Sequence, residues 1–236
     1  MITNQTSDFN NIDFNKGEVI LVDKPLDWTS FNVVDKIRKT IKVKKVGHTG
    51  TLDPKATGLL IICTGAKTKT ISSYLDLTKE YAGKIFLGKT TPTMDTESIN
   101  EATEQQDTSS IDRKMIEKVS ERFMGVIEQV PPSYSAIWVD GRRAYKLARK
   151  GREIKLEPRK VIIDKFKITD YDEPLISFEI SCSKGTYVRK IASDLGTELG
   201  CGAFLYELRR TKIGQYDLND AINIDKFQDL FANRVN

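Results

Sequence analysis

The chain has 236 residues, of which 39% are hydrophobic and 30% charged, and its formal net charge is +4. These values are typical of a globular protein with a sizeable core. No apolar run approaches the roughly 20 residues that a membrane-spanning helix needs. The polar first 16 residues lack the apolar centre of a signal peptide, so we expect a loose leader there.

Cysteine and histidine usage limits the chemistry further. Cys63, Cys182 and Cys201 include no C-x-x-C pair, and an odd count argues against a disulfide framework. A reducing, cytoplasmic compartment fits these free thiols best. His48 is the one histidine, so a zinc or other transition-metal site is not expected.

Basic residues are grouped rather than spread, while residues 95–112 are acidic. Such grouping suits a polyanionic partner, RNA before DNA or a membrane, although solvated faces would look the same. Charge alone therefore leaves both interpretations open. The three basic groups are Lys36, Arg38, Lys39, Lys42, Lys44 and Lys45; then the region from Arg142 to Lys160; then Arg209, Arg210 and Lys212.

The pattern of apolar residues in the first half predicts short strands around one helix. We expect a strand at 17–22, a helix capped by Thr29 or Ser30, a glycine-rich loop at 47–58, and strands at 59–63 and 81–87. The apolar face of this helix would be formed by Val33, Val34, Ile37 and Ile41.

The second half alternates helices and strands without a regular βαβ rhythm. Residues 97–110 are predicted to be an exposed connection. Helices are expected near 116–123, 142–150, 187–199 and 225–231, and strands at 161–168 and 175–182. Together these elements predict a mixed α/β fold with a mostly antiparallel sheet, and a single domain over residues 17–236.

Residues 83–90 match the phosphate-loop pattern G-x-x-x-x-G-K-[ST], but the physical context is wrong. A phosphate loop needs flexible residues between its glycines and a helix that begins at the lysine. Here Ile85, Phe86 and Leu87 favour a strand, and Pro92 follows where the helix should form. We therefore reject an NTPase.

Asp53 is the residue that the local sequence singles out for chemistry. It lies in a loop flanked by glycines and stiffened by Pro54, directly before an apolar strand that anchors the loop on the core. A carboxylate on such a loop is a candidate nucleophile or base. From the local sequence alone, an Asp-Pro turn with a capping role is the favoured explanation of Asp53.

Residues 47–60, GHTGTLDPKATGLL, resemble the signature of the TruB family of tRNA pseudouridine-55 synthases. Further segments resemble the family's motifs in the same order, so the resemblance runs from about Gly17 to about Ile222. It implies the pseudouridine synthase fold with a central RNA-binding cleft, an RNA-clasping insertion at 131–159 and no PUA domain. The further segments are VDKP at 22–25 with TS at 29–30, KEY at 79–81, LGKTTPTMD at 87–95, PPSYSA at 131–136, CSKGTYVR at 182–189 and GCGA at 200–203 with LRR at 208–210.

The resemblance implies an isomerase that converts uridine 55 in the T loop of tRNA to pseudouridine. It implies no cofactor. We expect no membrane association and no obligate protein partner, and a monomer is the default for a single domain of this size. The base leaves its stack to reach the site. Asp53 would be the catalytic nucleophile or would support the detached sugar, and Arg189 would ion-pair with Asp53. Tyr81 would stack on the flipped uracil and act as a general base that removes a proton.

The same resemblance assigns binding roles to four other residues, each with a simpler alternative. His48 would take the place of an extruded base, or be an ordinary loop histidine. Lys24 would support the Asp53 loop or contact RNA, or be a plain surface lysine. Tyr187 and Leu208 would complete the pocket wall, or simply pack; likewise Arg189 could be a surface arginine and Tyr81 a core residue.

The sequence departs from the family pattern at Asp27, usually glycine, at Pro92, usually an acid, and at Trp138, often a lysine. Asp tolerates a positive φ better than most residues do, and Trp138 offers a stacking surface in place of a phosphate contact. The main alternative function is a tRNA-binding folding chaperone with secondary catalysis. A guide-RNA-dependent synthase like dyskerin is a weaker one.

Overall fold

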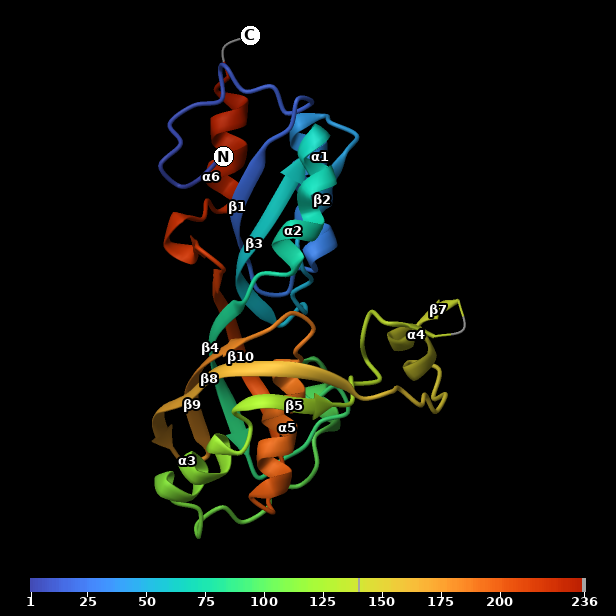
Figure 1. Ribbon diagram of the computed structural model, residues 1–236, viewed down its shortest axis with the longest axis vertical. Helices are drawn as coiled ribbons and strands as arrows, with labels where there is room; N and C mark the ends of the chain where they lie inside the picture. Colours follow the sequence, from blue (N-terminus) through green and yellow to red (C-terminus); the bar gives the residue numbers. More distant parts are fainter. Residues whose placement is uncertain (140, 235–236) are drawn as a thin grey trace. The chain divides into compact units, whose positions relative to one another are not determined.

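The computed structural model describes residues 1–139 and 141–234. The chain divides into two compact units. Unit 1 comprises Met1–Ala82 and the chain from Leu208 onwards, and unit 2 comprises Gly83–Glu207. Both boundaries fall inside strands, β4 (Lys79–Leu87) and β10 (Ala203–Ile213), so each of these strands contributes to both units. The strand order is β1-β3-β10-β4-β9-β8-β5, and the sheet is mostly antiparallel, as predicted (Figure 1).

In unit 1, β3 (Ala56–Thr64) is the strand around which the others assemble. It pairs antiparallel with β1 (Val19–Lys24) and with β2 (Val46–His48). It also pairs parallel with β10 through Leu208–Arg210, and β10 turns back into β11 (Tyr216–Asp217). The parallel pairing brings the LRR motif alongside the strand that follows Asp53.

Both faces of β1 and β3 are covered, which explains their continuous apolar runs. Ile20, Val22, Leu60 and Ile62 pack on one side with α1 (Ser30–Ile41) and α6 (Ile224–Ala232). The alternate residues pack on the other side with α2 (Ile71–Leu75), which follows the 3-10 helix η1 (Gly65–Thr70), and with η3 (Leu218–Asp220) and β11. The alternate residues are Val19, Leu21, Leu59, Ile61 and Cys63.

Helix α1 begins where the sequence predicts. Thr29 is its N-cap, and the side chains of Thr29 and Asn32 cap each other's backbone N–H groups. The predicted face of Val33, Val34, Ile37 and Ile41 is buried. This fixed helix start matters for function because the preceding turn, residues 24–28, contacts the Asp53 loop.

The expectation of a loose N-terminal leader is corrected by the structure. Ile2 forms a parallel bridge with Ile20. Phe9 and Phe14 are buried in the same core cluster as Phe227. The aromatic residues in this polar segment escaped notice because they are isolated and follow no helix or strand period, yet each removes a large apolar area from water.

Unit 2 contains β5 (Gly125–Gln129), β8 (Arg159–Asp172) and β9 (Leu175–Cys182), all antiparallel. Helix α3 (Arg113–Glu121) packs against β8 and against α5 (Val188–Glu198). Residues 96–101 form a 3-10 helix, η2 (Thr96–Glu101), in the predicted connection. Figure 1 shows β7 and α4 projecting beyond the ends of β5 and β8.

The strands β5 and β10 were not predicted, and the basic helix was predicted too long. Helix α4 spans only Ala144–Ala148 and follows two short strands, β6 (Trp138–Val139) and β7 (Arg142–Arg143). The candidate phosphate loop is indeed strand β4 up to Leu87. Among the described residues, no helix combines the length and apolar character that crossing a bilayer demands.

Candidate active site

The loop that carries Asp53 joins β2 to β3, and its backbone is held just before the carboxylate. The Ser30 hydroxyl accepts a hydrogen bond from the Leu52 N–H at 2.8 Å and lies 3.2 Å from the Leu52 carbonyl, to which it donates. Ser30 and Leu52 are both buried. A single side chain at the start of α1 therefore satisfies both backbone groups of the residue before Asp53.

The backbone just after Asp53 is held as well. The Pro54 carbonyl accepts the Asp27 N–H at 3.0 Å and faces the Lys24 ammonium at 3.4 Å. The Ala56 N–H closes a turn onto the Asp53 carbonyl at 3.0 Å. Asp53 itself is half-buried. The carboxylate thus lies between two anchored peptides rather than on a free loop.

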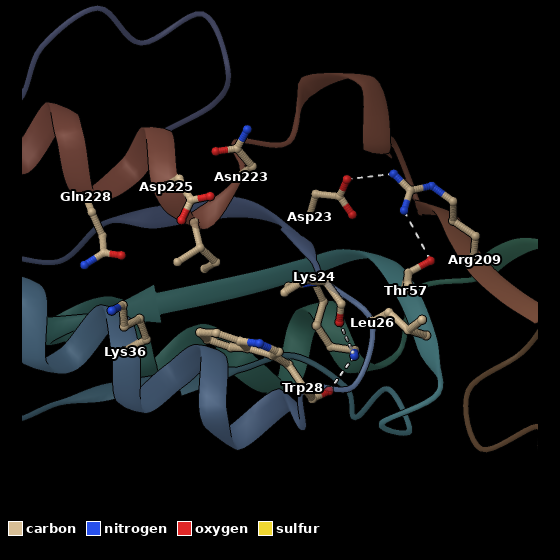
Figure 2. Close-up of a pocket in the computed structure, with 12 residues that line it drawn as sticks. Asp23, Lys24, Leu26, Trp28, Lys36, Thr57, Arg209, Asn223, Asp225 and Gln228 are labelled. Atoms are coloured by element: carbon tan, nitrogen blue, oxygen red, sulfur yellow. Dashed lines mark hydrogen bonds and ion pairs between the residues drawn. The ribbon is translucent and has the colours of Figure 1, made fainter. Parts of the chain in front are cut away.

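Lys24 is fully buried (0% exposed), which excludes the plain surface lysine. Its ammonium group donates to the carbonyls of Pro25 and Trp28 (Figure 2), and also to that of Pro54. Burial lowers the pKa of Lys24 to about 8, and the nearby carboxylates of Asp27 and Asp53 limit that decrease. The position of the ammonium group favours loop support over RNA contact.

Asp27 occupies the left-handed region at φ 62°, a conformation open to glycine and, among other residues, best tolerated by Asp and Asn. Its carboxylate pairs with Lys55 at 2.6 Å. Lys55 lies two residues beyond Asp53, so the side chain of Asp27 adds a second contact to the loop besides its backbone N–H. A turn that glycine could form is therefore also formed with Asp at position 27.

Arg210, which belongs to the third basic group of the sequence, is a buried arginine. It is 1% exposed, and its Nε donates to the Leu59 carbonyl at 2.7 Å while Nη2 donates to the Gly50 carbonyl at 3.2 Å. Its backbone lies against Gly58, where a Cβ would come within 2.3 Å of the Arg210 carbonyl oxygen. Arg210 therefore joins β10 to the start of the Asp53 loop.

His48 ends β2 and is half-buried. Burial lowers its pKa, the positive charge of Arg210 lowers it further, and a backbone hydrogen bond with Gly50 partly opposes both effects. The imidazole is consequently neutral at pH 7. A neutral ring beside the loop can stack or donate one hydrogen bond without adding charge.

Tyr81 and Leu208 lie on β4 and β10, which are neighbours in the sheet. Both side chains are half-buried, so Tyr81 is not a residue of the closed core. Leu208 is the β10 partner of Ala56, at the beginning of β3. In unit 1 the sheet thus brings Leu208 close to the end of the Asp53 loop.

A cavity of about 440 Å³ opens beside Lys24 in unit 1 (Figure 2). Arg209 lies at its edge, paired with Asp23 at 2.7 Å and with the Thr57 hydroxyl at 3.2 Å. Arg209 is exposed where Arg210 is buried, because consecutive residues of a strand face opposite sides.

In unit 2, Arg189 is buried (4% exposed) at the start of α5, so it is not a surface arginine. Its guanidinium donates to the Thr93 carbonyl at 3.1 Å and to the Tyr134 carbonyl at 2.6 Å. Thr93 is fixed in turn by Asp95 and Ser98, each 2.7 Å from its hydroxyl. Pro92 is exposed beside this buried network.

Tyr187 is the N-cap residue of α5, and its ring lies beneath two guanidinium groups. The Arg159 and Arg189 guanidinium carbons are 5.0 Å and 5.6 Å from the ring centroid. The Gln129 side chain donates to the Tyr187 carbonyl at 3.2 Å and accepts its N–H at 2.8 Å. The sequence offered no signal for Gln129, because a strand-end glutamine is ordinarily exposed.

The structure therefore gathers Lys24, His48 and Asp53 on one anchored loop system, with Leu208 at its end, and it joins Tyr187 to Arg189 in unit 2. The predicted ion pair between Asp53 and Arg189 links residues of the two units and stays a prediction. Within the described part of the chain, no cluster of His, Cys, Asp or Glu could hold a metal ion.

Comparison with known proteins identifies the family. Residues 38–188 match the model of the TruB family pseudouridylate synthase N-terminal domain, and residues 189–235 match that of the tRNA pseudouridylate synthase B C-terminal domain. A protein of Chlorobaculum tepidum named tRNA pseudouridine synthase B is 49% identical over 219 residues, covering 91% of this chain and 90% of that protein. Its namesake in Parabacteroides distasonis is 44% identical over 230 residues, covering 95% and 97%.

Solved structures agree with this assignment. A chain in the Cbf5-Nop10-Gar1 complex matches with a TM-score of 0.71 at 28% identity, over 92% of this chain and 54% of that one. A chain in an H/ACA RNP bound to a substrate RNA matches with a TM-score of 0.68 at 26% identity, over 92% and 53%. The present chain spans about half the length of these solved chains. Since the family model covers more than half of the sequence and the named relatives match along nearly their whole length, the chain belongs to the TruB family of pseudouridylate synthases, which are isomerases.

Proposed function

We propose that this chain converts uridine 55 in the T loop of tRNA to pseudouridine, acting as a monomer in the cytoplasm. The names of its relatives support tRNA as the substrate. The three buried, free cysteines suit a reducing compartment. The target uridine would be flipped out of its stack, because the glycosidic bond of a stacked base is not accessible to a side chain.

Asp53 is the proposed catalytic nucleophile. In the reaction the N–C glycosidic bond breaks, the uracil turns, and a carbon of the ring rejoins the sugar. Asp53 would attack the sugar or support its charge while the base is detached. The observation that carries this role is the anchoring of the peptides before and after Asp53 by Ser30, Asp27 and Lys24. Such support preorganises a reacting group.

The other proposed roles follow the family resemblance. Tyr81 would stack on the flipped uracil and act as a base, and Arg189 would hold the Asp53 carboxylate ionised. His48, Tyr187 and Leu208 would line the RNA site. The two backbone carbonyls that hold the Arg189 guanidinium support a fixed orientation of this cation.

The first test is incubation of the purified chain with an unmodified tRNA transcript, followed by base-resolution mapping of pseudouridine. We expect one modified uridine in the T loop and no product from Asp53→Asn, with tRNA binding retained. Asp229→Asn, at an exposed aspartate of α6 outside the cavity, is the matched control and should behave like the parent. Tight binding without product in the parent would instead favour a tRNA folding chaperone.

A further inference from the structure

The insertion at 131–159 exposes a large aromatic ring. Trp138 is 62% exposed, although tryptophan is among the residues whose burial is most favourable. It lies on β6 directly opposite Arg143 of β7, so both side chains are on the same face of this two-stranded sheet. Tryptophan is enriched at binding interfaces because it joins a large apolar ring to a polar N–H group, so its exposure here makes Trp138 a candidate contact residue.

Arg143 turns this indole into a cationic surface. Its guanidinium carbon lies 4.3 Å from the centroid of the Trp138 ring, the closest cation–ring contact recorded in the described residues. The same guanidinium donates to the Ala136 carbonyl, which fixes its position over the ring. The pair forms a platform, Trp138–Arg143, that presents delocalised π surface together with a permanent positive charge.

The platform is anchored to the rest of the insertion. Ala144 is fully buried, and its N–H donates to the Ile137 carbonyl at 2.7 Å. The Tyr145 N–H donates to the Ser135 carbonyl at 3.0 Å, and Ser135 is buried. Since the residues on both sides of the hairpin are held, Trp138 is positioned before any ligand arrives, which lowers the entropy lost on binding.

The charges around the platform identify its partner. Residues 141–152, between Asp140 and Glu153, contain no acid and carry six cations in or shortly after the hairpin: Arg142, Arg143, Lys146, Arg149, Lys150 and Arg152. Of these, Arg149 is paired with Glu97 at 2.9 Å. A polyanion with exposed ring faces complements this surface, whereas a protein or membrane partner would not need the combination.

We propose that the Trp138–Arg143 platform stacks an unpaired nucleobase of the RNA substrate. The inference rests on the proposed function for its RNA, and it adds one positioned stacking contact within the insertion. Stacking on an aromatic ring tolerates any base, so the platform would raise affinity and fix one nucleotide's position without reading its identity.

Intrinsic fluorescence can test the stacking directly, because the chain has only two tryptophans. Titrating the parent with a tRNA transcript should quench part of the emission as a base covers the indole. Trp138→Phe should lose that quenching, since only Trp28 still emits. Quenching that persists unchanged in Trp138→Phe, or is missing in the parent while RNA binds, would overturn the proposal.

A series of substitutions separates stacking from simple hydrophobicity. Trp138→Phe keeps a π face, whereas Trp138→Leu keeps apolar area without one. We expect RNA affinity to fall little in Trp138→Phe and roughly 5- to 100-fold in Trp138→Leu. Urea unfolding of both variants should match the parent, because the ring is exposed. Equal affinities for parent and Trp138→Leu would contradict the proposal.

Abasic scanning of a T-arm RNA identifies the stacked nucleotide. At one position, removal of the base should abolish the affinity difference between the parent and Trp138→Leu, and at other positions the difference should persist. Pseudouridine formation is measured in parallel. Product without any such position contradicts the platform and leaves the proposed function intact; a stacked position without product supports the platform and contradicts the function.

Discussion

Arg209 and Arg210 are neighbours in one strand with opposite surroundings, and the difference decides what each can do. Arg209 faces solvent and a surface carboxylate, while Arg210 is buried against the Gly50 and Leu59 carbonyls. Arg210 therefore acts on the protein itself, and its charge affects the adjacent histidine. Two consecutive arginines in a sequence do not reveal which of them is buried unless the strand that contains them is recognised first.

The chain's one histidine makes that influence measurable. Burial and the Arg210 charge both lower the pKa of His48 below its usual 6.5. Arg210→Met should raise this pKa, because the repelling charge is gone. The measurement is an NMR titration of the single imidazole. Arg209→Met, at the exposed neighbour, should leave the pKa nearly unchanged; equal shifts in both variants would refute a local effect of Arg210.

Lys24 makes stability depend on pH in alkaline solution. Its pKa is about 8 in the folded chain against 10.5 for a solvated lysine, so the unfolded chain binds more protons between these values. The contribution of Lys24 to the free energy of unfolding should therefore rise with pH through this window. In urea unfolding, the free energy of unfolding of the parent minus that of Lys24→Met should increase from pH 8 to pH 10. A constant difference would contradict the lowered pKa.

Among single residues, the sequence predicted those that belong to long motifs and missed those that act through backbone contacts. The Asp53 loop was located from its glycines, its proline and the family motif. The contributions of Ser30, Gln129 and Arg210 depend on which carbonyl or N–H faces their side chains. That information comes only from the folded path of strands far apart in sequence.

Among the elements, α1 was predicted most closely and β10 was missed. The apolar residues of α1 recur at helical spacing, and Thr29 marks its start. Strand β10 instead shows no regular alternation, because three bulky residues come first and a largely charged stretch ending at Lys212 suggests a basic surface. Its strand character is imposed by pairing with β3 and β11, and such tertiary pairing is invisible to local patterns.

The N-terminal segment should contribute strongly to stability despite its polar sequence. Phe9→Ala removes a fully buried ring that contacts Phe14 and Phe227, so we expect a loss of about 3–5 kcal/mol in the free energy of unfolding. Phe31→Ala, at an exposed phenylalanine, is the matched control and should cost far less. Urea denaturation measures both. Equally small losses of unfolding free energy in both variants would instead support a loosely packed N-terminal segment.

For the whole molecule, the predicted reaction should be sensitive to salt. Each phosphate contact made by a lysine or arginine adds about 0.7–0.9 to the slope of log affinity against log salt concentration. Lys150→Gln and Arg152→Gln, in the insertion, should each reduce that slope. Lys165→Gln, paired with Glu179 at 2.6 Å, is the control that should not. A slope unchanged by the two insertion variants would place the RNA elsewhere.

We also expect the RNA to be recognised mainly through its T arm. If the contacts needed for recognition lie in the T arm, a T-arm minihelix should react about as fast as whole tRNA at subsaturating concentrations. Initial rates of pseudouridine formation for the two RNAs provide the comparison. A minihelix that reacts far more slowly would show that recognition extends beyond this arm.

Because unit 2 is a single continuous segment between the two parts of unit 1, the chain cannot complete its parts in the order in which the ribosome makes them. Asp53 emerges early, but Arg210, which secures the Gly50 end of its loop, is added roughly 160 residues later, on the order of 10–30 s at typical elongation rates. Throughout that interval the nascent chain carries the Asp53 carboxylate on a loop that β10 does not yet support. A product truncated or stalled before β10 is therefore expected to lack activity, even if unit 2 has already folded and its β6–β7 hairpin can already bind RNA.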